Sequence, residues 1–244
     1  MQTLISEIAE DTYRITLRPA GSFISFNHFL IRDTASTLVH TGHNKTFEVV
    51  LEQVAKLIDP STLRYICFSH YEPDECGSLN KWLATAPLAE ACVNKICDSH
   101  LNDFASRPSR LMKDSDFLDL GTHQLSFLET PHFPHAWEAA LYMDTKTKVL
   151  FSSDIGSQQG FPQLNGHAVD IEDIVKIQNK LHYMPYGPHL SAGVKRLENL
   201  DFNTMATMHG NCLDRTQSTE LFRLLEENNN SHTPAAAALQ HVAK

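Results

Sequence analysis

The first part of the chain carries short apolar runs that favour β-strands. They cover residues 12–17, 22–31 and 36–40 and are separated by proline, glycine and polar turn residues. Residues 45–58 change the pattern, because apolar side chains then recur at the spacing of one helix face. A further β-type run follows at 63–68. The chain therefore begins as strands and then alternates strands with helices.

The rest of the chain repeats this strand–helix rhythm. Further strands are predicted at residues 89–92, 124–129, 139–144, 148–152 and 204–208, the third and fourth as a hairpin. Helices are predicted at 77–86, 99–105, 170–182, 191–200 and 220–227. The pattern predicts a layered α/β (α+β) architecture in one domain, residues 1–227. Residues 228–244 are polar and then alanine-rich, so we expect a frayed helix or a flexible C-terminal tail.

The composition is that of a globular protein with an acidic balance. The 244 residues are 42% hydrophobic and 20% charged, and the formal net charge is −9. Nucleic acid and anionic membranes are therefore unfavourable partners, since both attract basic surfaces. No run approaches the roughly 18 apolar residues of a membrane-spanning helix, and the N-terminus lacks a signal-peptide pattern. We expect a cytoplasmic protein whose five cysteines, with no CxxC pair, are reduced thiols.

The segment after the apolar run 63–68 carries the clearest chemical signal. His70, Glu72 and Asp74 occupy every second position there. Alternate residues of an extended segment point the same way, so one short loop can aim three metal-binding groups at one pocket. Pro73 and Gly77 indicate a loop rather than a helix. Taken alone, the triplet is equally compatible with a polar loop after a buried strand.

Three further candidate ligands lie just past other apolar strands. They are His132, Asp154 and His209, and the last of these precedes a glycine that permits a tight turn. Any one of them alone is more often a capped or surface residue. Strand ends are where layered α/β proteins build their sites. The shared position of these residues, together with the triplet, therefore favours a metal site.

These residues, in this order, resemble the metallo-β-lactamase fold. Glu72, in place of the second histidine usual in that superfamily, resembles more narrowly the flavodiiron branch and its oxygen-binding diiron relatives. The motifs at 150–154, 182–185 and 208–210 support the narrower match. The resemblance covers roughly residues 10–225 and implies an αββα sandwich, two mixed β-sheets flanked by helices, with a dinuclear metal site at one sheet edge.

The resemblance also implies a ligand assignment. His70, Glu72 and His132 would hold one iron, and Asp74 and His209 would hold the second. Flavodiiron enzymes usually place a further histidine directly after the motif aspartate. The chain has a glutamate at that position, and whether it binds the second metal stays open.

Asp154 would bridge the two metals in the same scheme. The candidate set contains three carboxylates and three histidines, and hard oxygen donors favour iron or manganese over zinc. We therefore expect two Fe ions, cycling between Fe2+ and Fe3+, with bridging oxygen species as the resemblance implies. O2 or NO would be the small-molecule ligand.

Flavodiiron reductases carry a flavodoxin domain after the diiron domain, and we expect none here. About twenty residues follow the last predicted core element, too few for another α/β domain. Two classes of function then stay open. One is an oxygen-sensing or oxygen-response protein with a signalling partner. The other is an enzyme, either an O2 or NO reductase fed by a separate flavoprotein or a zinc or iron hydrolase of the superfamily. A homodimer is a candidate assembly.

Several residues around the ligands are weaker candidates. Tyr183 lies in a segment that resembles the family's active-site wall, and its phenol is our candidate catalytic group. Tyr71 should point away from the metals, by alternation with its neighbours. His135 and Trp137 are expected at most to line the pocket, and His43 could face it. For a sensor, we expect the loop at 156–166, with few core residues, to change mobility with redox state.

Overall fold

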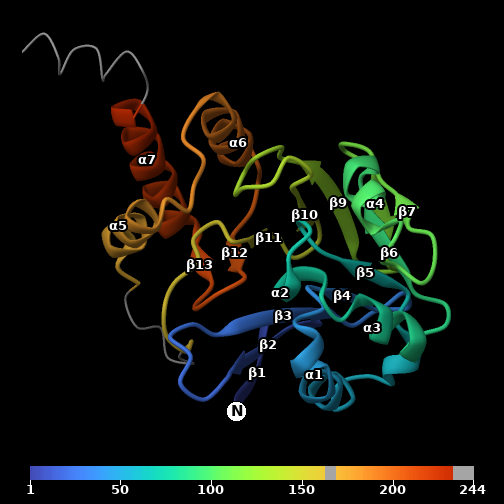
Figure 1. Cartoon of the computed structure of the whole chain (residues 1–244). Coiled ribbons are helices and arrows are strands. Elements are labelled where there is room, and N and C mark those ends of the chain that lie inside the picture. Colours follow the sequence, from blue (N-terminus) through green and yellow to red (C-terminus); the bar gives the residue numbers. More distant parts are fainter. Residues whose placement is uncertain (163–168, 233–244) are drawn as a thin grey trace, which may run out of the picture.

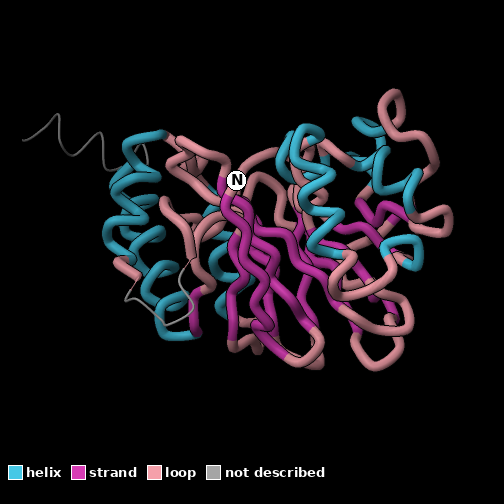
Figure 2. Tube along the Cα trace, turned by 90° about the horizontal axis from the view of Figure 1, so that it is seen from below, coloured by secondary structure: helices cyan, strands magenta, loops and turns pink. Residues whose placement is uncertain are grey.

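Two mixed β-sheets lie face to face in this computed structural model, which describes residues 1–162 and 169–232. Figure 1 shows one sheet from the N-terminal half and one from the C-terminal half, and Figure 2 shows the strands gathered between helices on either side. The rings of Phe29 and Phe151, from the two sheets, lie 5.4 Å apart in the apolar layer between them. The expected αββα sandwich is confirmed.

The first sheet has the order β1-β2-β3-β4-β5-β6-β7. Its strands are β1 (Gln2–Ala9), β2 (Thr12–Arg18), β3 (Phe26–Ile31), β4 (Thr37–Val39), β5 (Tyr65–Cys67), β6 (Glu90–Val93) and β7 (Arg110–Leu111). The early strands pair antiparallel, whereas β4, β5, β6 and β7 pair parallel. The parallel pairing brings the ends of β4 and β5 to the same edge of the sheet.

The second sheet has the order β13-β12-β11-β10-β9-β8. Its strands are β8 (Phe117–Asp119), β9 (Gln124–Glu129), β10 (Ala140–Asp144), β11 (Val149–Ser153), β12 (Thr204–Thr207) and β13 (Leu213–Asp214). β11 and β12 are parallel neighbours, and the other pairs are antiparallel. The predicted hairpin is β10–β11, and the chain segments that follow β11 and β12 leave the sheet side by side.

Helices cover the outer face of each sheet. The helices of the N-terminal half are α1 (Phe47–Val54), α2 (Pro73–Cys76), α3 (Leu79–Thr85) and α4 (Lys95–Leu101), with short 3-10 turns η1 (Asn44–Thr46) and η2 (Pro60–Thr62). Those of the C-terminal half are α5 (Ile171–Leu181), α6 (Pro188–Glu198) and α7 (Arg215–His232). Apolar residues of α1, α3 and α4 pack on the first sheet, and those of α5, α6 and α7 pack on the second.

Several elements differ from the expectation. The strands β1, β7, β8 and β13 are additional to the predicted strands, and α4 lies four residues earlier than predicted. Helix α7 continues to His232, and its Asn229 is buried and accepts a hydrogen bond from the backbone N–H of Gly187. Residues 228–232 are thus helical, and the remainder of the expected tail lies outside the described residues. Among the described helices, none is long and apolar enough to cross a membrane.

Candidate metal centre

The first candidate ligands follow β5 and lead into the short helix α2. Glu72 is the last extended residue, at φ −133° and ψ 156°, and α2 begins at Pro73. Proline is well suited to the first position of a helix, because its missing N–H and fixed φ cost nothing there. The predicted loop is therefore wrong from Pro73 onward. Asp74 reaches the site from a helical turn rather than by strand alternation with His70 and Glu72.

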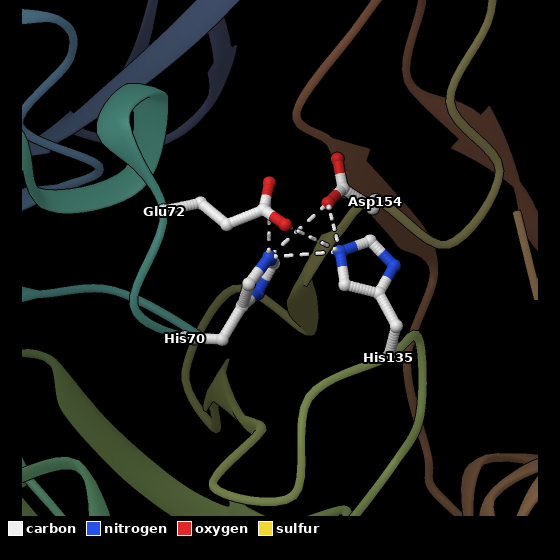
Figure 3. A group of neighbouring side chains, drawn as sticks. All are labelled: His70, Glu72, His135 and Asp154. Atoms are coloured by element: carbon white, nitrogen blue, oxygen red, sulfur yellow. Dashed lines mark hydrogen bonds and ion pairs between the residues drawn. The ribbon is translucent and has the colours of Figure 1, made fainter. Parts of the chain in front are cut away.

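Four side chains converge in what we call the first ligand group: His70, Glu72, His135 and Asp154. Figure 3 shows them pointing toward one another from three different segments of the chain. Nε2 of His135 lies 3.3 Å from Oε1 of Glu72 and 3.4 Å from Oδ2 of Asp154. Nε2 of His70 lies 3.6 Å from Oε2 of Glu72 and 3.5 Å from the same Asp154 oxygen.

The other oxygen of Asp154 faces a second ligand group, which consists of Asp74 and His209. Oδ1 of Asp154 lies 3.3 Å from Nε2 of His209, and that nitrogen lies 3.6 Å from Oδ2 of Asp74. The opposite ring nitrogen of His209, Nδ1, is 2.8 Å from the backbone oxygen of Ser25. The buried Asp154 carboxylate therefore stands between the two groups, with one oxygen toward each.

His132, a predicted ligand, is not part of either group. Its ring packs against His189, with 4.5 Å between the ring centroids. Its backbone N–H donates to the carbonyl of Ala136 at 2.8 Å, and both residues have positive φ. This turn directs His135, rather than His132, toward the site. The two histidines share one proline-flanked loop, so residue type and spacing alone do not distinguish them.

The carboxylates around His70 favour the charged form of its ring. Burial lowers the pKa of His70, but its contact with Glu72 and the carboxylates of Glu75 and Asp154 outweigh burial and raise the pKa to about 9. The contacts of Glu72 with His135 and His70 lower the pKa of Glu72 well below its usual range. A metal ion that binds His70 would therefore displace this proton and take over its positive charge.

Tyr183 lies beside the first ligand group. The centroid of its ring is 5.0 Å from that of His135, and the two rings meet edge to face. Burial and the negative charge of Asp154 raise the pKa of Tyr183 far above its usual range. The phenol therefore stays protonated and is available as a hydrogen-bond donor at the site.

The remaining predicted residues lie outside the two ligand groups. Glu75 is completely buried and faces the protein interior. Tyr71 is 42% exposed and packs against His100 and Phe104, which confirms that it points away from the ligands. Trp137 is also largely exposed, and it packs against His100 rather than against a ligand.

The loop after Asp154 is more firmly held at its start than its composition indicates. The backbone N–H of Gln158 donates to the carbonyl of His209 at 3.0 Å, and that of Gly160 donates to Phe23 at 2.8 Å. Residues 163–166, the rest of the segment for which mobility was expected, lie outside the described residues.

His43 packs on Phe26, with 4.9 Å between the ring centroids, and it belongs to neither ligand group.

A cavity of about 480 Å³ opens beside the second ligand group. Glu72, Asp74, His209 and Tyr183 line one end, and side chains of α5 line the other. No lysine or arginine is among the described lining residues, and acidic α5 residues contribute to the wall. The described wall of the cavity therefore offers no cationic side chain to hold an anion beside the ligand groups.

The first ligand group has the spacing expected of the ligands of one metal ion. Nitrogen and carboxylate donors about 2.0–2.2 Å from an ion stand about 3–3.5 Å from one another, which is the spacing within the first ligand group. The Asp154 carboxylate, with one oxygen toward each group, is suited to contact two ions. The two groups together offer three carboxylates and three histidines, a mixed oxygen and nitrogen donor set that is compatible with a transition-metal ion.

The sandwich of two mixed sheets and the ligand groups at its edge define a metallo-β-lactamase fold with a flavodiiron-like core. The family described as "ODP family beta lactamase" matches residues 24–210, and the chain belongs to this family.

Curated relatives and solved structures agree with this placement. Diflavin flavoprotein A 1 of Synechocystis sp. is 30% identical over 76% of this chain and 33% of its own length. Flavo-diiron protein FprA2 of Clostridium acetobutylicum is 28% identical over 78% of this chain and 50% of its own length. The structure of rubredoxin oxygen:oxidoreductase from Desulfovibrio gigas matches with a TM-score of 0.82 at 18% identity, covering 93% of this chain and 62% of that one. The chain thus spans a third to a half of the length of these curated relatives.

Proposed function

We propose that this chain is a non-haem diiron protein that binds dioxygen or nitric oxide in an oxygen-sensing or oxygen-response role. The observation that carries the proposal is the position of Asp154, whose two oxygens lie 3.4 Å from His135 and 3.3 Å from His209. A carboxylate placed in this way serves two ions at once. The names of the relatives, a flavo-diiron protein and an oxygen oxidoreductase, support the same chemistry.

The side chains of the two groups would hold the irons. The proposed ligands are His70, Glu72 and His135 for the first iron, Asp74 and His209 for the second, and Asp154 between them. When bound, the irons would supply the electrons and the open coordination positions that dioxygen or nitric oxide requires. His135 takes the place that His132 had in the expectation from sequence.

The surrounding residues then select and orient the small ligand. Tyr183 presents a protonated phenol beside Asp154 and can donate a hydrogen bond to a ligand in the cavity. The described residues of the cavity wall include no lysine or arginine, so only the proposed irons could bind an anionic substrate there. This lack of cationic side chains supports a small diatomic ligand over a larger hydrolase substrate that carries a carboxylate or phosphate.

Sustained reduction needs an electron donor, and we propose a separate flavoprotein for this role. Relatives of this chain are named as diflavin and flavo-diiron proteins, but the stretch that matches covers only part of their length. All five cysteines are free thiols, which supports a reducing compartment such as the cytoplasm.

Anaerobic loading with Fe2+ tests the metal centre. The protein should take up about two irons per chain, as six ligands of this kind allow. Mixing with O2 should oxidise the irons in a single turnover and produce near-ultraviolet and visible charge-transfer absorption. Uptake of a single zinc in preference to iron, or fast thioester or phosphodiester hydrolysis with no response to O2, would exclude this function in favour of the hydrolase.

Comparison of the two redox forms separates a sensor from a reductase. A sensor must bind its partner unequally in the reduced and oxidised forms. Residues 156–162 connect Asp154 to the loop of His209 through Gln158, so we expect their hydrogen exchange to differ between the two forms. Helix α1, on the outer face of the first sheet, is the internal control and should exchange equally in both. Identical exchange throughout, together with steady O2 consumption on addition of a flavoprotein reductase, would favour the reductase.

A further inference from the structure

Glu75 is a buried carboxylate that belongs to neither ligand group. Its side chain is completely shielded from solvent although it lies on a short helix at the edge of the site. Charged side chains are almost never buried in this way without partners that compensate for lost hydration. The neighbouring Asp74 faces His209, and successive residues of a helix point in different directions. Glu75 therefore faces the interior because Asp74 faces the second ligand group.

The partners of Glu75 come from the segments that carry two ligands. Its Oε2 accepts a hydrogen bond from the backbone N–H of Ser69 at 2.9 Å, and its Oε1 accepts one from the hydroxyl of Ser153. Ser69 directly precedes His70, and Ser153 directly precedes Asp154. One carboxylate thus joins the loop after β5 to the end of β11. Oε2 of Glu75 has one more neighbour, Nε2 of His40, at 3.5 Å.

The ring of His70 supplies an independent observation. Its Nε2 faces the first ligand group, whereas its buried Nδ1 has no hydrogen-bonding partner in the part of the chain that the structure describes. Oε1 of Glu75 lies 4.0 Å from this Nδ1. A histidine that binds a metal through one nitrogen almost always donates its other N–H to a carboxylate, a carbonyl or water, which fixes the orientation of the ring. Glu75 is the carboxylate that faces this nitrogen, at ion-pair rather than hydrogen-bond distance, and a small rotation of either side chain would close the contact.

We propose that Glu75 is a positioning residue for the metal bound by the first ligand group and not a ligand of the second metal. It orients the ring of His70 through Nδ1 and holds the segments of His70 and Asp154 at a fixed separation. The inference rests on the proposed function, because it presupposes a metal at the first ligand group. It makes a distinct prediction about which of the two metals depends on Glu75.

The test measures metal affinity in two backgrounds, with Co2+ as the probe. Glu75→Gln keeps the shape of the side chain and removes its charge. It should weaken the binding of Co2+ to the first ligand group about 10- to 100-fold, the usual effect of losing such a partner. The same loss should appear in a His209→Ala background, where the second group is already disabled. A ligand of the second metal would instead show its effect only when His209 is present.

Two further variants make the test independent of general destabilisation. Ser153→Ala removes one hydrogen bond to Glu75 and should weaken the same Co2+ site by a few-fold, even if Glu75→Gln does not fold. Asp144→Asn is the control, because it removes the charge of another buried carboxylate, which lies 2.7 Å from Nδ1 of His123. Asp144 pairs with the first residue of β11, whereas the metal ligand Asp154 follows the last residue of that strand. This control should lower the unfolding midpoint and leave Co2+ affinity unchanged.

The outcomes distinguish failure of this inference from failure of the proposed function. The positioning role is supported if Glu75→Gln lowers Co2+ affinity both in the wild-type background and in the His209→Ala background. The visible d–d absorption of Co2+ bound to the first ligand group should also change. An affinity within twofold of wild type for both Glu75→Gln and Ser153→Ala overturns it, as does an effect that disappears in the His209→Ala background. A wild-type protein that binds no Co2+ or Fe2+ overturns the metal centre itself.

Discussion

The Nε2 atoms of His70 and His135 lie 3.0 Å apart, although 65 positions separate the two residues in the sequence. Their rings meet edge to face, with 4.6 Å between centroids. Two imidazoles that approach through ring nitrogens need a shared proton or a shared metal ion between them. The carboxylates of Glu72 and Asp154 face the same point, which is the arrangement that the proposed shared metal ion requires.

The first prediction concerns the two histidines of the loop after β9. His135→Ala should reduce the bound iron from about two to about one per chain, because it removes a donor from the first ligand group. The matched control is His132→Ala, whose ring packs on His189 and which should retain both irons. Elemental analysis of the two purified variants measures this. Equal iron content in the two variants, or loss only in His132→Ala, would contradict the structural assignment.

The second prediction concerns the residue between the two groups. Asp154→Ala should lose both metals or retain a partly filled site, because each Asp154 oxygen faces a different group. Metal analysis and the number of binding events in a titration check this result. Tyr71→Phe is the control, since the exposed Tyr71 ring packs away from the ligands. Full occupancy by two metals in Asp154→Ala would show that this carboxylate does not bridge them.

The third prediction concerns the phenol of Tyr183. Tyr183→Phe should keep both irons, since Tyr183 belongs to neither ligand group, but should release bound nitric oxide about tenfold faster. A hydrogen bond from the phenol to a polarised ligand contributes about 1.5 kcal/mol, which corresponds to roughly a factor of ten. Rapid-mixing spectroscopy measures the dissociation rate. Unchanged release would exclude a role for the phenol in holding the ligand.

The strand pattern was sufficient to locate most of the site. His70, Asp154 and His209 each lie within a few residues of the end of a strand, and such strand ends meet at one edge of the sandwich. This relation follows from periodicity, because a run of apolar residues that ends in a polar one marks the edge of the core. The fold and the general position of the ligands were therefore predictable from the sequence.

Local backbone geometry determines which side chains face the site, and the strand pattern does not predict it. His132 and His135 are equivalent by residue type, and only the turn closed by Ala136 determines which ring enters the site. Glu75 has the composition of a ligand, but α2 turns it toward Ser69 and away from the second group. Such choices depend on one or two dihedral angles and on partners distant in the sequence, which a periodic pattern does not encode.

The last prediction is a pH dependence that originates at His28. Burial lowers the pKa of His28 from 6.5 to about 3, although a hydrogen bond to the backbone of His40 opposes this effect. The unfolded chain therefore binds a proton that the folded protein excludes, so the free energy of unfolding contributed by His28 is fully present above pH 6.5. It decreases as the pH falls toward 3, by about 1.4 kcal/mol per pH unit.

His28→Asn tests this contribution, because its side-chain amide can donate to the His40 carbonyl, which lies 3.0 Å from Nδ1 of His28. The variant should be less stable at pH 7.5 by about 1–3 kcal/mol through lost packing. Its stability should nevertheless fall less steeply in acid, so that the two curves approach each other below pH 6. Urea unfolding of both proteins from pH 7.5 to 4, with chelator present to exclude metal effects, measures the difference. Parallel curves would show that His28 has the same pKa in the folded and unfolded states, in contradiction to the effect expected from its burial.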